Sequence, residues 1–259
     1  MINAGSLIGA LMEGGLNSGA GARLQNAMGP KGLGQPGVAD LLGNLLGAGQ
    51  SGGGLGGMLG SVLGGGKSAG LGNAAIGGVL GSIFGGGGGV GGVAKGGAMA
   101  VLGMLAVNAL KGYMADKSGD PGQQANMQLM AGLREPESET EQQQVQDLAM
   151  LIVRAMVNAA KADGQVDRDE LDKILGRLQK SGADAADMDF VRQELSAPMD
   201  TDAIIAAVTD PQVAAQVYAA SLLAISVDTD AERIYIDRLG EGLGLPMEAR
   251  NQIHSSLGI

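Results

Sequence analysis

Four carboxylates crowd into one short stretch of this 259-residue chain. Within the sequence K-A-D-G-Q-V-D-R-D-E at 161–170, they are Asp163, Asp167, Asp169 and Glu170. Carboxylate oxygens are the ligands that calcium and magnesium prefer, so this density suggests cation binding. The same residues also suit a helix start. Asp167 can accept hydrogen bonds from the first amides of the next helix, and Glu170 can reach back to the cap residue.

The spacing of Asp163, Gly164 and Glu170 matches the later part of a calcium-binding EF-hand loop, but the early ligand positions do not match. Those positions would fall on Ala159 and Lys161, and a lysine there would repel the cation. An ordinary EF-hand is therefore excluded. Two alternatives stay open: a weaker site shared with a second acidic loop, or carboxylates that only cap helices.

The second acidic loop lies in A-I-S-V-D-T-D-A-E-R-I-Y-I at 224–236. Asp228 and Glu232 take the places of the first and last carboxylates of the first loop. The second loop is shorter and has no glycine. Thr229 and Glu232 have the spacing of a capping box, in which each side chain bonds the other residue's backbone amide.

Other catalytic chemistry finds little support in the sequence. The chain has no cysteine, which excludes disulfides, thiol nucleophiles and zinc–thiolate sites. Its one histidine, His254, has no second histidine or cysteine near it in the sequence, so we expect a surface residue rather than a member of a triad or zinc site. Arg154 and Lys161 precede the first loop and are expected to neutralise its carboxylates. We expect no enzyme and no catalytic residue.

Helical periodicity is strong from residue 141 onward, and each acidic loop joins two helices. The apolar positions predict a first helix over about 141–162. Later helix starts are marked by capping residues or by proline in the first turn. These signals are Asp167, Asp184, Asp200, Asp210 with Pro211, Thr229 and Pro246. No alternating strand pattern occurs, so we predict an all-α fold with a seven-helix domain over 140–259.

The two acidic sequences at 161–170 and 224–236 resemble the TerB-like tellurite-resistance domain. Within that family they are most similar to the YebE type, bacterial proteins of unknown function often described as inner-membrane proteins. The resemblance covers about 140–256 and implies a seven-helix fold with a divalent-metal site. By this resemblance the metal ligands would be Asp163, Glu170, Asp228 and Glu232, with calcium or magnesium bound. It also implies a place at the bacterial inner membrane or its cytoplasmic face, with a cytoplasmic location as the alternative.

The first half of the chain has a different composition from the second. Of the 48 glycines, 41 lie in residues 1–133; this region has a net charge of +2, whereas residues 134–259 have −12. The acidic half argues against nucleic-acid binding and is compatible with cations or basic partners. We predict four segments: a glycine-rich, partly disordered apolar leader at 1–94, an apolar helix at 95–115, an acidic, proline-containing linker at 116–139, and the helical domain at 140–259.

Small residues recur at every fourth position in much of the leader, for example from Gly77 to Gly89. On a helix this spacing permits close backbone approach, as in membrane helix pairs, but ordering a glycine backbone has a high entropic cost. A flexible region and membrane-associated helices both stay open. The clearest helix lies between Lys95 and Lys111, and its uncharged interval is shorter than the roughly 20 residues of a bilayer span. Its apolar side chains have no obvious partner in the sequence, so we expect membrane association through residues 70–111.

Two classes of function follow. The first is a non-enzymatic, membrane-associated interaction module of unknown partner, linked to envelope or metal and tellurite stress. The alternative is a soluble divalent-cation-binding or sensing protein that uses the acidic loops. The oligomeric state does not follow from the sequence. Because the leader and linker are expected to share few apolar contacts with the helical domain, we expect residues 140–259 to fold alone.

Overall fold

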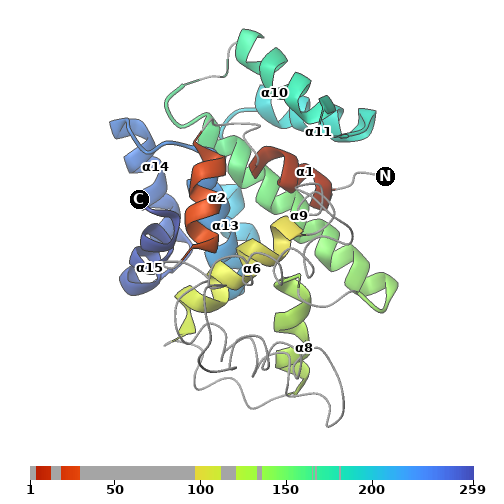
Figure 1. Cartoon of the computed structure of the whole chain (residues 1–259), viewed down its shortest axis with the longest axis vertical. Coiled ribbons are helices and arrows are strands. Elements are labelled where there is room, and N and C mark those ends of the chain that lie inside the picture. The colour runs from red at the N-terminus through yellow and green to blue at the C-terminus, as the bar shows by residue number, and fades with distance from the viewer. Residues whose placement is uncertain are drawn as a thin grey trace, which may run out of the picture.

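The computed structural model describes residues 4–12, 19–29, 97–111, 121–132, 136–164, 166, 168–180 and 182–259. Every regular element in these ranges is a helix, which confirms the predicted all-α class. The helices, labelled as in Figure 1, are α1 (Ala4–Ala10), α2 (Ala20–Met28), α6 (Gly97–Ala109), α8 (Pro121–Met130), α9 (Glu139–Ala160), α10 (Arg168–Lys180), α11 (Ala185–Ser196), α12 (Thr201–Ala207), α13 (Pro211–Ala224), α14 (Asp230–Gly242) and α15 (Met247–Leu257).

The seven helices expected after residue 140 are α9 to α15, and α11 to α15 begin at the predicted signals, whereas α9 is capped by Ser138. Asp184, Asp200 and Asp210 each accept hydrogen bonds from backbone amides in the first turn of the following helix. Thr229 and Glu232 form the predicted capping box at the start of α14. These signals work because the first amides of any helix lack partners within the helix. The predicted cap at Asp167 lies outside the described residues.

The long helix α9 and the buried helix α13 form the centre of the fold (Figure 1). Every residue of α13 from Ala214 to Ala224 is buried, because α6, α8, α9, α14, α15 and α2 all pack against it. Helix α6 crosses one side of α13, whereas α10 and α11 pack together at one end of α9. The sequence of α13, made mostly of Ala, Val and Leu, suits a helix covered on all sides.

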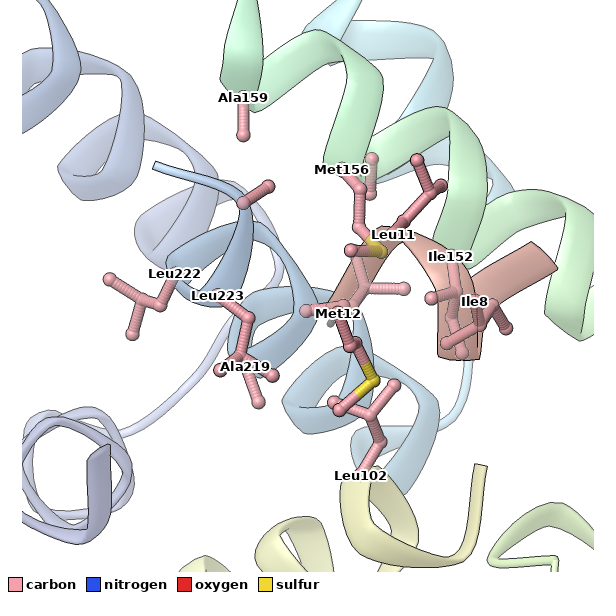
Figure 2. Close-up of a cluster of buried hydrophobic side chains, with 14 of the residues drawn as sticks. Ile8, Leu11, Met12, Leu102, Ile152, Met156, Ala159, Ala219, Leu222 and Leu223 are labelled. Atoms are coloured by element: carbon pink, nitrogen blue, oxygen red, sulfur yellow. The ribbon is translucent and has the colours of Figure 1, made fainter. Parts of the chain in front are cut away.

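The first helix contributes to this core. Leu7, Ile8, Leu11 and Met12 have no exposed surface. Figure 2 shows side chains from this segment lying between α9 and α13, with Leu102 of α6 beside them. Burial of such side chains contributes about 1.5–3 kcal/mol each. The expectation that the leader shares few apolar contacts with the helical domain is therefore wrong.

Helix α6 is also buried. Leu102 and Leu105 are at most 1% exposed, and α13, α1 and α15 cover the helix. Its apolar side chains thus have partners inside the protein, contrary to the expectation from sequence. Within the described ranges, no helix is both long enough and apolar enough to cross a membrane. The small-residue spacing from Gly77 to Gly89 lies outside the described residues.

The predicted linker contains a helix that is anchored at its end. The side chains of Gln212 and Gln216, both buried in α13, donate hydrogen bonds of 3.0 and 2.9 Å to the carbonyl oxygens of Met127 and Met130. Both carbonyls lie in the last turn of α8, and the Met127 oxygen also accepts a 2.9 Å hydrogen bond from the amide of Ala131. Gly132, with φ of 66°, then turns the chain. The domain boundaries at 94, 115 and 139 stay predictions.

Candidate functional site

The first acidic loop follows α9. Asp163 is exposed there, and Gly164 has φ of 157°, a backbone conformation that favours glycine. Glu170 lies in the first turn of α10, but its side chain is outside the described part of the structure, as is Asp167. The proposed pairing of Asp163 with Glu170 therefore stays a prediction.

Two basic residues near this loop, Lys161 and Arg154, bond the neighbouring helix α11. Lys161 is buried, and its Nζ donates hydrogen bonds of 2.8 and 2.9 Å to the carbonyl oxygens of Glu194 and Ala197. Burial lowers the pKa of Lys161, although the nearby Glu194 carboxylate opposes this shift. Arg154 forms a 2.8 Å ion pair with Glu194. Both residues thus bond α11 near its carboxyl end; whether they also neutralise the first loop stays a prediction, since the side chains of residues 167–170 lie outside the described part of the structure.

The second acidic loop joins α13 to α14 and is tightly bonded. Glu232 is 7% exposed, and its Oε2 accepts hydrogen bonds from the amides of Asp228 and Thr229 and from the Thr229 hydroxyl, all at 3.0 Å. Burial alone would raise the pKa of Glu232, but these hydrogen bonds together lower it below its usual value. The carboxylate is held in its charged form, as a capping group should be.

An arginine from the far end of the chain completes this loop. Arg23 lies on α2, and its Nη1 donates hydrogen bonds to the carbonyl oxygens of Leu222 and Ile225. Its Nη2 donates a 2.7 Å hydrogen bond to the carbonyl oxygen of Ser226. These acceptors lie at the carboxyl end of α13, which carries partial negative charge from unpaired carbonyls. One guanidinium therefore binds three backbone carbonyls, in the last turn of α13 and in the two residues that follow the helix.

The charge of Arg23 is matched by the acidic residues of the same loop. Burial lowers the pKa of Arg23, and the carboxylates of Glu232 and Asp228 oppose that shift. Asp228 and Glu232, two of the four predicted metal ligands, thus already interact with a positive charge of the protein itself, that of Arg23. Sequence reasoning missed this contact because Arg23 is about 200 residues away. The available signal was that it is the sole arginine among the first 133 residues.

No group of three or more acidic or histidine side chains gathers to hold a metal ion in the residues that the structure describes. The metal site at Asp163, Glu170, Asp228 and Glu232 stays a prediction, since the Glu170 side chain lies outside the described part of the structure. Asp228 and Glu232 lie together at the start of α14, and Asp163 lies in the other loop.

A second polar cluster lies between α13, α14 and α15. His254 is half-buried, and its Nε2 makes a 2.8 Å hydrogen bond with the Tyr218 hydroxyl, which corrects the expectation of a surface histidine. Burial lowers the pKa of His254; Asp237 opposes the shift, and Arg23 and Arg250 reinforce it. Burial also raises the pKa of Tyr218 to about 12.

A small pocket of ≈ 90 Å³ lies between the α12–α13 and α14–α15 turns. Most of the residues that line it are apolar, including Leu110, Val208, Leu243 and Leu245. Its one acidic residue, Asp210, already accepts hydrogen bonds from the amides of Gln212 and Val213 as the cap of α13. The pocket therefore brings together no acid–base pair.

Comparison with known families agrees with this helical architecture. Residues 69–257 match a family described as "Protein of unknown function (DUF533)", and the match spans well over half of the chain. The chain belongs to the DUF533 family. The matched region includes α6, α8 and all helices from α9 to α15, whereas α1 and α2 precede it.

A curated protein is also similar to part of this chain. An uncharacterised protein encoded in the ampR 5′ region of Yersinia enterocolitica is 28% identical over 106 residues, which cover 41% of this chain and 76% of the relative. No solved structure matches the chain. These comparisons do not name the TerB-like or YebE group, so that resemblance stays a prediction within a family of unknown function.

Proposed function

We propose that this DUF533 protein is a non-enzymatic interaction module that works at a membrane surface. The observation that carries the proposal is the placement of the two ends of the glycine-rich stretch. Helix α2 ends before residues 30–96, α6 begins after them, and both helices pack against α13 and against each other. The folded body thus holds both ends of one long apolar, glycine-rich segment.

The sequence of that segment favours a membrane contact upstream of α6. Ser68 to Ala94 contains no charged residue. The sequence predicts membrane association through residues 70–111. Because α13, α1 and α15 cover the side chains of α6, we assign the membrane contact to residues 70–94 of that range. An uncharged segment avoids the cost of about 2.5–3.5 kcal/mol that each buried charge adds in a bilayer.

The non-enzymatic part of the proposal rests on the hydrogen bonds that charged side chains make to helix ends. Glu232 caps α14, Arg23 bonds the end of α13, and Lys161 bonds the end of α11. Groups that satisfy backbone atoms in the folded state are not available to a substrate without breaking the fold. The resemblance to TerB-like domains is the basis for assigning this module to envelope or metal stress at the bacterial inner membrane.

Membrane fractionation tests the proposal. Placing two charges in the segment with Ile76→Asp and Val79→Asp should move the protein from the membrane pellet to the soluble fraction, because the pair costs about 5–7 kcal/mol of insertion. Ser51→Asp with Ser61→Asp is the matched control, since it adds the same charge outside residues 70–94. Wild-type protein that is wholly soluble in cells would overturn the membrane assignment.

A third variant separates membrane contact from folding. Leu102→Asp with Leu105→Asp places the charges in α6, where both side chains are buried in the protein core. This variant should lose its cooperative unfolding transition in circular dichroism, because a buried unpaired charge is strongly destabilising. The variants at 76 and 79 should keep that transition.

A further inference from the structure

The two amino-terminal helices lie outside the family unit, which is defined here as residues 69–257, but they complete its core. The family match begins at residue 69, whereas α1 and α2 end by residue 28. Helix α1 buries its apolar side chains against α9 and α6, and α2 buries Ala20, Leu24 and Ala27 near α13 and α15. A segment outside the family unit therefore occupies a prepared surface of that unit.

The polar contacts of this segment are made mainly by one side chain. Arg23 reaches the carbonyl oxygens of Leu222, Ile225 and Ser226, and Asn26 donates a 3.3 Å hydrogen bond to the carbonyl oxygen of Leu257. A guanidinium is planar and presents donors in a fixed fork, whereas an ammonium is a compact point charge. Three carbonyls spread along a helix end suit the fork better.

The acidic residues add charge to this geometry. Glu232 is fixed by three hydrogen bonds and is present as the carboxylate, and both it and Asp228 act on Arg23. The site therefore combines backbone acceptors, a helix carboxyl end and two carboxylates around one delocalised cation. These are the requirements for recognising a guanidinium group rather than a divalent metal ion.

We propose that the carboxyl end of α13 is a guanidinium-binding site, and that Arg23 in this site latches the α1–α2 segment onto the family unit. Removal of the guanidinium weakens this docking and leaves the site empty. The empty site then takes a guanidinium group supplied from solution. This inference is independent of the membrane proposal, because it concerns only contacts within the described helices.

A pair of introduced cysteines measures directly whether the α1–α2 segment is docked on the family unit. A β-carbon built at Gly258 would lie 3.5 Å from the Cβ of Asn26, which falls at the short end of the separation found in disulfides, about 3.5–4.5 Å. The chain has no other cysteine. Asn26→Cys with Gly258→Cys should therefore form one intramolecular disulfide on oxidation, seen as a faster monomer band on a non-reducing gel. Circular dichroism checks first that the pair folds, because Gly258 has φ of 75°.

The latch is tested in this cysteine-pair background. Arg23→Ala should lower the ratio of docked to undocked chain by about tenfold, because the docked state loses several charge-assisted hydrogen bonds while the apolar contacts of α1 and α2 remain. Arg23→Lys should recover only part of this loss. Methylguanidinium on the order of 10 mM should restore the disulfide yield and the thermal transition of Arg23→Ala by binding the native state, while methylammonium should not.

Each contrary outcome overturns the proposal. An unchanged disulfide yield in Arg23→Ala would mean that apolar contacts alone dock the segment. Equal yields for Arg23→Lys and wild type, or equal rescue by methylammonium, would mean a site for any cation. A covalent dimer formed by mixing the two single-cysteine variants would show that the segment docks on a second copy, which contradicts a latch within one chain.

Discussion

The two acidic loops have similar sequences but are stabilised in different ways. The first, after α9, turns through Gly164 and leaves Asp163 exposed. The second, after α13, has no glycine, and Val227 adopts φ of 56°, the one positive φ of a non-glycine residue in the described ranges. A β-branched residue rarely adopts this conformation without support from its surroundings.

That support comes from outside the loop. The carbonyl oxygens of Ile225 and Ser226, just before Val227, accept hydrogen bonds from Arg23, and Glu232 bonds the amides of Asp228 and Thr229 just after it. The first loop can form from its own sequence because glycine tolerates the turn. The second depends on a distant arginine. Similar acidic patterns thus do not indicate equal roles.

The largest expected effect comes from removing that arginine. Arg23→Ala should destabilise the protein by about 2–3 kcal/mol, because the carbonyl oxygens at the end of α13 lose a charged donor and Glu232 and Asp228 lose a nearby cation. Arg154→Ala is the matched change near the first loop and should cost less than about 1 kcal/mol, because its ion pair with Glu194 is on the surface. Urea unfolding of the two variants measures both values, and equal losses would remove the contrast between the loops.

The glycine of the first loop should have the next largest effect. A β-carbon at Gly164 would meet no atom within 4 Å, so Gly164→Ala should destabilise the protein only through its backbone, by about 1–2 kcal/mol. Gly176 in α10 also faces open space, but it is helical, so Gly176→Ala should stabilise by about 0.5–1 kcal/mol. Thermal unfolding of both variants should give opposite signs; the same sign would contradict a conformational role for Gly164.

Protonation of His254 should lower the stability of the folded protein. Burial and the charges of Arg23 and Arg250 lower the pKa of His254, against the opposing Asp237. The folded state therefore favours the neutral ring that faces Tyr218. This contribution is complete above the usual pKa of about 6.5 and is lost as the pH falls from there through the lowered folded pKa.

The check is a series of melting temperatures between about pH 7.5 and pH 5, across the usual histidine pKa. The wild type should lose stability over this range more steeply than His254→Gln, which cannot titrate. Tyr218→Phe is the control that removes the hydrogen bond but keeps the histidine. Parallel curves for wild type and His254→Gln would exclude this histidine as the source of the pH dependence.

Divalent cations should have the smallest effect. Because Arg23 already faces Asp228 and Glu232, calcium or magnesium should raise the melting temperature by no more than about 1 °C above sodium chloride of equal ionic strength. A larger rise that disappears in Asp163→Asn would support the alternative of a cation site shared between the loops, and would show that the two loops act together. A rise that survives this substitution would be general screening of the acidic half.

The sequence alone determined where the helices of the acidic half begin. Asp184, Asp200, Asp210 and the pair Thr229–Glu232 act on amides two to three residues away, so their effect is local and readable along the chain. The all-α class and the seven helices followed from these caps and from apolar periodicity. The same local rules could not say whether Asp163 and Glu170 hold a cation.

Only the tertiary structure decided what the apolar and charged residues of the first half contact. Glycine-rich sequence suggested that the leader and the helix around Leu102 lacked apolar partners, but Ile8 and Leu102 are both fully buried in the core around α9 and α13. Arg23 finds its acceptors about 200 residues away, and His254 finds Tyr218 on another helix. Such contacts depend on how whole helices pack, and packing energy is a property of the assembled core rather than of any short stretch of sequence.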